Sequence, residues 1–462
     1  MNSSSGYGGD GGSKVQKLKG TSIESDVGHV FDKKDIAGIQ AHFDKFGLAV
    51  ISGILTDKQC DDLILEQWAK IILNQQWTPA YKIVIKGKDG HVLNPTVDAD
   101  KAEFLAQVTG PLTPFVRKAF EAGFPLHIGF GAACDPAVWH LPLVWNLRQD
   151  PDLYEIAKAI CKWLELWTTI CRQIHVLPGQ GSDEFLHWDR NMDKEWQESL
   201  AGIEQEIGVQ GKFVYQDSSF ICVEGTHTNE FLDKFYVAYD PFYPNLAEGN
   251  AKFGLNIDKE DPFDLFGKRT EVKVPKGCWI VWHPRLLHGT RKNGINETIK
   301  YGSYIGFNAA GSRPQYKVNC GVDELEDRLH SYKNGEAPEL YGSLDKTHFY
   351  PKRFDNFRSG LDSAIKKLPD RHAMIGSRIQ KKDGKVVPTL VPVPQVGYVP
   401  HELTDLGKKL LGLLSYEESD GAAGGSRVQD VPNVDDTESD EDKQTAPPLK
   451  KQCAGNGRSV YP

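Results

Sequence analysis

Apolar positions divide the first part of the chain into a helix, a strand and a second helix. Apolar residues recur at helical spacing over residues 36–46, and Gly47 ends this pattern. The apolar run at 48–51 predicts a short buried strand. A second helical pattern follows Thr56 and Asp57, either of which can cap it.

Strand-like patterns dominate after a helix predicted over residues 151–166. The segments that alternate at period two, or that are apolar between turn residues, are 170–177, 212–215, 217–227, 271–274, 278–283 and 298–307. Pro-Lys-Gly at 275–277 joins two of them. The pattern predicts a mainly β domain with flanking helices.

Candidate metal chemistry lies in His187-Trp188-Asp189 and in His288, which follows His187 by 101 residues. Side chains alternate across a strand, so His187 and Asp189 point the same way, and the long spacing brings the third ligand from a non-neighbouring strand. A barrel or sandwich rolled on itself delivers this arrangement. Two imidazoles and one carboxylate on one face suit a ferrous ion and leave positions open for a co-substrate and oxygen. His-x-Asp alone is a common tripeptide, so the surrounding sequence must support the interpretation.

Two histidines compete for the distal ligand position. His283 and His288 are five positions apart and would face opposite sides of one regular strand, so only one can be the ligand unless Pro284 breaks the strand. A further histidine, His227, is interpreted as the end of a structural turn.

Lys300 is a candidate anion-binding residue. It shares one face of its predicted strand with Gly302 and Tyr304. A buried ammonium needs an anionic partner, which a dicarboxylate co-substrate would supply. The alternative is that Lys300 lies solvated on the outer face.

Taken together, these features resemble the phytanoyl-CoA dioxygenase family of Fe(II)/2-oxoglutarate-dependent oxygenases, over about residues 30–310. The resemblance implies a double-stranded β-helix (jelly-roll or cupin-like) with iron held by His187, Asp189 and His288. It selects His288 because the distal histidine of the family is followed by glycine and a hydroxyl residue. It also implies that Thr290 and Lys300 bind the 2-oxoglutarate carboxylate, although most of the family has arginine at the second position.

The same resemblance implies Fe(II), with 2-oxoglutarate and O2 as co-substrates, and hydroxylation of a C–H bond with release of succinate and CO2. The substrate is expected to be a small molecule, and its identity is not readable from the sequence. The carboxylate of Asp189 favours hydroxylation, because related halogenases have a small residue there. Two alternatives remain: a non-catalytic binding or scaffold protein on a degenerate barrel, and a cupin-like metalloenzyme that does not use 2-oxoglutarate.

Net charge and cysteine content argue against several other classes of protein. The net charge is −9, and ten acidic and five basic residues within 417–462 contribute −5 of it, so the body lacks the basic balance of duplex nucleic-acid binders. Eight cysteines without a Cys-x-x-Cys pair predict reduced thiols. The sequence contains no uninterrupted apolar run of about 18 residues, so no membrane-spanning helix is predicted. We therefore expect an intracellular, cytoplasmic protein; the basic residues near 450 are too weak a signal for the nucleus.

Composition also predicts four segments. Residues 1–24 are Gly- and Ser-rich and residues 416–462 form an acidic tail, and both are expected to be disordered. The oxygenase domain is predicted over 25–310. A helical extension that packs on the barrel is predicted over 311–415.

Overall fold

The computed structural model describes residues 23–24, 28–74, 84–111, 127–128, 132–133, 138–170, 173–176, 186, 188, 208–239, 265, 267–289, 298–311, 323–335, 380–382, 385–387 and 398–416. All of them lie in the compact unit Lys19–Tyr416. The segments predicted to be disordered lie almost wholly outside the described residues, so their prediction stands untested.

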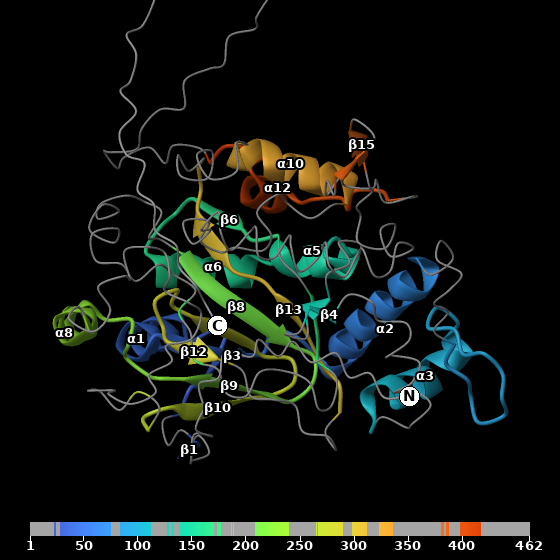
Figure 1. The fold of residues 1–462 in the computed structure, drawn as a ribbon, viewed down its shortest axis with the longest axis horizontal. Coiled ribbons are helices and arrows are strands. Elements are labelled where there is room, and N and C mark those ends of the chain that lie inside the picture. Colours follow the sequence, from blue (N-terminus) through green and yellow to red (C-terminus); the bar gives the residue numbers. More distant parts are fainter. Residues whose placement is uncertain are drawn as a thin grey trace, which may run out of the picture. The chain divides into compact units, whose positions relative to one another are not determined.

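Two sheets carry the fold (Figure 1). The large sheet runs in the order β2 (Val30–Asp32), β3 (Leu48–Ser52), β11 (Trp279–Trp282), β8 (Gly208–Val214), β13 (Lys300–Tyr304), β7 (Gln173–Val176), β5 (Ala132–Ala133), β4 (His127–Ile128). The small sheet runs in the order β1 (Ile23–Glu24), β10 (Thr270–Val274), β9 (Ser218–Cys222), β12 (His288–Gly289). β14 (Phe307–Ala309) pairs with β8 and with β6 (Leu166–Thr168), and β15 (Gln380–Lys382) pairs with β16 (Lys385–Val387).

The chain passes repeatedly between these sheets. β8 lies in the large sheet, β9 and β10 in the small sheet, β11 in the large, β12 in the small and β13 in the large. The neighbours among these strands are antiparallel, whereas β2 pairs parallel with β3 and β1 pairs parallel with β10, so both sheets are mixed. Each sheet is therefore assembled from strands that are distant in sequence.

One apolar cluster joins the two sheets and defines their inner face. It contains Val50, Val214 and Ile280 from the large sheet and Phe220 and Val272 from the small sheet. Because side chains alternate along a strand, the even-numbered positions of β8, β11 and β13 share this inner face.

The odd-numbered positions of the large sheet face the helices. Ala49, Phe213 and Trp279 belong to a second cluster with residues of α1 (Ile36–Phe46), α2 (Asp57–Asn74), α3 (Asp98–Thr109), α5 (Pro142–Arg148) and α6 (Pro151–Cys161). β3 and β11 are thus buried on both sides, which is why they are continuous apolar runs in the sequence. The prediction of a mainly β core with flanking helices is confirmed by this arrangement.

Local signals fix the ends of the first two helices. Asp35 caps α1 by accepting a hydrogen bond from the Gly38 N–H at 3.0 Å, and Gly47 ends it at φ +81°. Thr56 and Gln59 form a reciprocal capping box at the start of α2. These boundaries agree with the sequence pattern.

The helix predicted over 151–166 is too long. α6 ends at Cys161, because Lys162 adopts the left-handed conformation at φ +54° and donates its N–H to Lys158 O. Leu166 instead begins β6, which is buried and pairs with β14. The apolar spacing continued beyond the helix because the strand that follows is buried as well.

Two helices near the C-terminal end are tied to β6. α10 (Glu324–Asn334) and α12 (Asp405–Leu411) lie side by side next to β6 (Figure 1). Buried Arg328 of α10 donates to Thr168 O at 2.7 Å, to Leu410 O at 2.9 Å and to Leu411 O at 3.3 Å. One guanidinium therefore holds a strand and the end of a neighbouring helix together.

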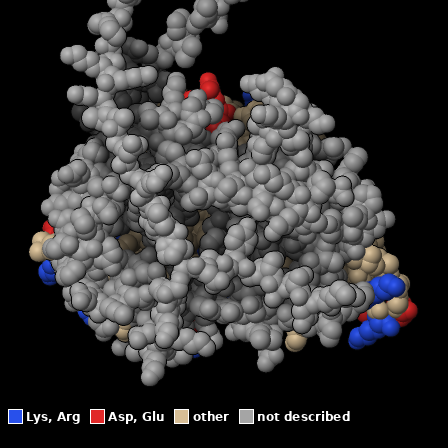
Figure 2. All heavy atoms as spheres, viewed as in Figure 1, with Lys and Arg blue, Asp and Glu red and all other residues tan. Residues whose placement is uncertain are grey.

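Among the described residues, no helix is long and apolar enough to span a membrane. Where described side chains reach the face drawn in Figure 2, Lys and Arg lie next to Asp and Glu at its right-hand edge. That part of the surface therefore mixes both signs of charge.

Candidate functional site

His288 projects from β12 onto the inner face between the sheets. It is 4% exposed and stands opposite Cys222 in the β9–β12 register. Its ring stacks on Phe220 at a centroid distance of 5.5 Å and contacts Trp282 at 5.3 Å. Two aromatic rings thus fix the plane of the imidazole.

One hydrogen bond of His288 sets its tautomer. Nδ1 lies 2.9 Å from Leu286 O, and a carbonyl oxygen can only accept, so Nδ1 carries the proton. In the neutral ring the lone pair then lies on Nε2. This is the state of a metal-binding histidine whose second nitrogen is oriented by a backbone carbonyl.

His283, the rival candidate, has the opposite arrangement. It follows the end of β11, where its N–H donates to Gly47 O at 2.7 Å. Its Nδ1 accepts the Arg285 N–H at 3.0 Å, so the lone pair of that nitrogen is already used within the turn. The chain turns between β11 and β12, so the two histidines do not share one strand.

His227 lies in the turn after β9, as interpreted from the sequence. Its Nε2 lies 3.1 Å from Asp44 O in the last turn of α1, and its ring is 5.1 Å from that of His283. Burial lowers the pKa of His227. This buried neutral ring connects the turn to the helix.

The other two predicted iron ligands, His187 and Asp189, and the predicted co-substrate residue Thr290 lie outside the described residues. Their flanking residues do not: Leu186 is 1% exposed and, with Trp188, belongs to an apolar cluster that contains Ile221 and Leu287. Trp188 also contacts Phe235 of α8 (Asn229–Tyr239) at a ring distance of 5.0 Å. Ile221 and Leu287 precede Cys222 and His288 and face away from the inner cluster.

Among the described residues, no group of three or more His, Cys, Asp or Glu side chains could hold a metal ion. Two of the three predicted ligands are not among those residues. The described part therefore supplies one candidate ligand, His288.

Lys300 lies on the inner face of β13 and is partly buried, and its binding of an anion stays a prediction. A second lysine, Lys212 of β8, lies on the same face and is only 7% exposed. Burial, and then the charge of Lys300, lower the pKa of Lys212 to about 8. Lys212 was not predicted from the sequence, because its burial depends on the pairing of β8 with β11 and β13, which lie far along the chain.

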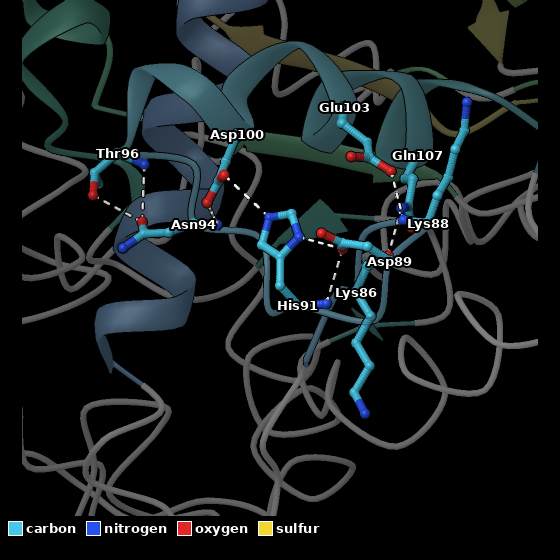
Figure 3. A network of polar contacts seen from close by, with 9 residues as sticks. All are labelled: Lys86, Lys88, Asp89, His91, Asn94, Thr96, Asp100, Glu103 and Gln107. Carbon is cyan, nitrogen blue, oxygen red and sulfur yellow. Dashed lines mark hydrogen bonds and ion pairs between the residues drawn. The ribbon is translucent and has the colours of Figure 1, made fainter.

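A separate polar network joins the turn at residues 84–93 to α3 (Figure 3). The ring of His91 contacts Asp89 through Nδ1 and Asp100 Oδ1 through Nε2 at 3.2 Å. Asp100 Oδ2 also accepts the Asn94 N–H at 2.9 Å. These hydrogen bonds therefore hold the turn against the first turn of α3.

We expect His91 to titrate above its usual range. The hydrogen bond to Asp89, and then that to Asp100, raise the pKa of His91. Because the folded-state pKa is raised, the stabilisation is complete below the unfolded-state pKa and is lost as the pH rises through the folded value. An NMR titration of the ring should show this, and Asp89→Asn should return the pKa toward its usual value. An unchanged titration in that variant would refute the assignment.

The chain matches no family model and no curated protein. Its structural neighbours SnoN, EctD, AviO1 and ThoJ are phytanoyl-CoA dioxygenase-like Fe(II)/2-oxoglutarate oxygenases at low identity. The non-heme α-ketoglutarate-dependent epimerase SnoN from nogalamycin biosynthesis is 13% identical with a TM-score of 0.34, over 67% of this chain and 95% of its own. EctD from S. alaskensis with bound Fe is 11% identical with a TM-score of 0.32, over 59% and 76%.

A third similar structure is GlcNAc Inducible Gene 2, GIG2 (DUF1479), from Candida albicans. It is 12% identical with a TM-score of 0.40, over 77% of this chain and 81% of its own. At such TM-scores and identities, these similarities establish neither the fold nor the chemistry of this chain.

Proposed function

We propose that this chain is an Fe(II)/2-oxoglutarate-dependent oxygenase that holds its iron with His187, Asp189 and His288. The observation that carries the proposal is the packing of Leu186 and Trp188 in the cluster that includes Ile221 and Leu287. In an extended segment side chains alternate, so residues next to outward-facing side chains face inward. His187 and Asp189 would then share the inner face with His288.

The strand order supports a double-stranded β-helix as the scaffold. In that fold the chain crosses repeatedly between two facing sheets, as it does from β8 to β13 around the inner apolar cluster, with β9 and β10 as an antiparallel pair within the small sheet. Leu186 and Trp188 belong to the same apolar cluster as Ile221 of β9 and Leu287, so both side chains lie against the outer side of the small sheet.

The chain's own residues fit such a centre. The Leu286 carbonyl keeps the proton on Nδ1 of His288 and so presents Nε2 for coordination. Phe220 and Trp282 hold the ring, and the apolar inner face excludes water. Bound iron would supply the activation of oxygen, with 2-oxoglutarate as co-substrate. In this proposal, Thr290 and Lys300 bind the carboxylate of 2-oxoglutarate. The reaction hydroxylates a C–H bond of a small-molecule substrate.

Anaerobic addition of Fe(II) and 2-oxoglutarate tests the proposal. The expected result is the visible charge-transfer band of the chelate, followed by succinate when oxygen is admitted. His187→Ala/Asp189→Ala is the control and should give neither signal. If the unaltered protein binds neither iron nor 2-oxoglutarate, the proposed function is wrong.

Lys300→Ala should raise the KM for 2-oxoglutarate about 10- to 100-fold, the cost of one charge-assisted hydrogen bond. The physical reason is the loss of one donor to the carboxylate. Steady-state rates of succinate formation at varied 2-oxoglutarate concentration measure this KM. Turnover that is independent of both 2-oxoglutarate and Lys300 would favour the cupin-like metalloenzyme instead.

A further inference from the structure

Lys212 is a buried cation to which the proposed iron centre assigns no role. It is 7% exposed, and in the described part of the chain it has neither a hydrogen bond nor an ion pair. The only described charge that perturbs it is that of Lys300, which is of the same sign. Burying an unpaired ammonium is costly, and placing a second ammonium near it adds to the cost.

The position of Lys212 directs it into the space between the sheets. It stands opposite Tyr304 on β13 and opposite Ile280 on β11, both of which belong to the inner face. Its Cε lies 3.6 Å from the point that a Cβ on Gly302 would occupy. The missing side chain of Gly302 therefore leaves room for the stem of Lys212 along the same face as Lys300.

A second buried donor lies on this face. Trp282 pairs with Gln210, two residues before Lys212, and its ring is 6.3 Å from that of Tyr304. Trp282 Nε1 is buried and, among the described residues, has no hydrogen-bond partner. Buried donors normally have acceptors, so the inner face offers positions for an acceptor that the described protein atoms do not supply.

We propose that Lys212 and Lys300 together form a two-lysine site that binds one carboxylate group of a small dicarboxylate. The choice of 2-oxoglutarate as that dicarboxylate rests on the proposed function. A single lysine is a point charge and cannot make the two parallel hydrogen bonds of an arginine. Two ammonium groups from adjacent strands restore two donors, one for each carboxylate oxygen. Lys212 on β8 thereby supplies the second hydrogen-bond donor that an arginine at position 300 would have provided.

Calorimetric titration tests this site without chemistry at iron. Metal-free protein is titrated with glutarate, which lacks the keto oxygen, and Fe(II)-loaded protein is titrated anaerobically with 2-oxoglutarate. Lys212→Met retains the apolar stem and removes the charge. It should lower the affinity for both ligands about 10- to 100-fold. Lys212→Arg should retain most of the affinity.

Thermal unfolding separates binding from a structural role. Removing an unpaired buried charge should leave the Tm of ligand-free Lys212→Met equal to or above that of the unaltered protein. A lower Tm together with unchanged affinity would mean that Lys212 is structural, and it would overturn the proposal.

The pH dependence gives an independent readout. With a pKa of about 8, the affinity of the unaltered protein should fall about tenfold between pH 7 and pH 9 as Lys212 deprotonates. The other described titratable groups on this face are Lys300, Tyr304, Cys222, Cys278 and His288. Lys212→Arg leaves all five in place, so its affinity should stay nearly level over this range.

The outcomes distinguish this site from the proposed function. If 2-oxoglutarate binds with iron and Lys212→Met has no effect, the two-lysine site is wrong and the oxygenase stands. If glutarate binding depends on Lys212 but iron and 2-oxoglutarate do not bind together, the site stands and the oxygenase is wrong. If neither dicarboxylate binds under any condition, both are wrong.

Discussion

His288→Ala is expected to abolish stable iron binding and to reduce succinate formation by more than about 100-fold, since loss of even an outer partner of a metal ligand costs about 10- to 100-fold. The reason is the state of the ring: the Leu286 carbonyl accepts the Nδ1–H, so Nε2 is the atom that we propose as the iron ligand, and the substitution removes it. Iron content after gel filtration and single-turnover succinate formation measure the two effects.

His283→Asn is the matched control. The side-chain oxygen of asparagine can accept the Arg285 N–H in place of Nδ1, so the turn between β11 and β12 should survive. Iron affinity should remain close to that of the unaltered protein. Iron binding that depends on His283 and not on His288 would reverse the assignment of the distal ligand.

Gly211→Ala is expected to lower the free energy of unfolding by about 3–5 kcal/mol, the combined effect of overpacking and a broken buried hydrogen bond. A Cβ at this position of β8 would lie 2.3 Å from Ile305 O and 2.3 Å from Trp279 Nε1. These two atoms are joined by a 3.0 Å hydrogen bond, and Ile305 also donates its N–H to Gly211 O. Neither the backbone carbonyl nor the buried indole can move aside freely.

Urea denaturation with circular dichroism measures this loss of stability. Gly28→Ala is the control, because nothing lies within 4 Å of a Cβ there. Its midpoint should match that of the unaltered protein. If Gly211→Ala were equally neutral, the close packing of β8 against Trp279 would be refuted.

The sequence predicted those elements whose signals are local. The end of α1 at Gly47, the cap of α2 at Thr56 and the buried strands β3 and β11 all follow from short patterns. β6 was absorbed into a predicted helix because its burial comes from β14, which lies far along the chain. Apolar spacing records that a residue is buried but not which partner buries it.

The candidate site was predictable only in part for the same reason. Spacing left His283 and His288 as alternatives, and the difference between them lies in which atom each Nδ1 meets. Lys212 looks like an ordinary solvated lysine until β13 and β11 close on both sides of β8. Its burial results from long-range strand pairing, which no local pattern encodes.

Arg328 has a consequence for where the chain can be shortened. Its guanidinium donates to carbonyl oxygens of β6 and of the last turn of α12, and its Cζ lies 5.0 Å from the centroid of the Trp167 ring. A chain cut after residue 311 would lose Arg328 and α12 together, and it would leave the Thr168 carbonyl and the Trp167 indole facing water. Such a fragment should aggregate or be degraded during expression even though it retains every proposed ligand. We therefore expect the smallest stable fragment of the chain to extend at least to Leu411.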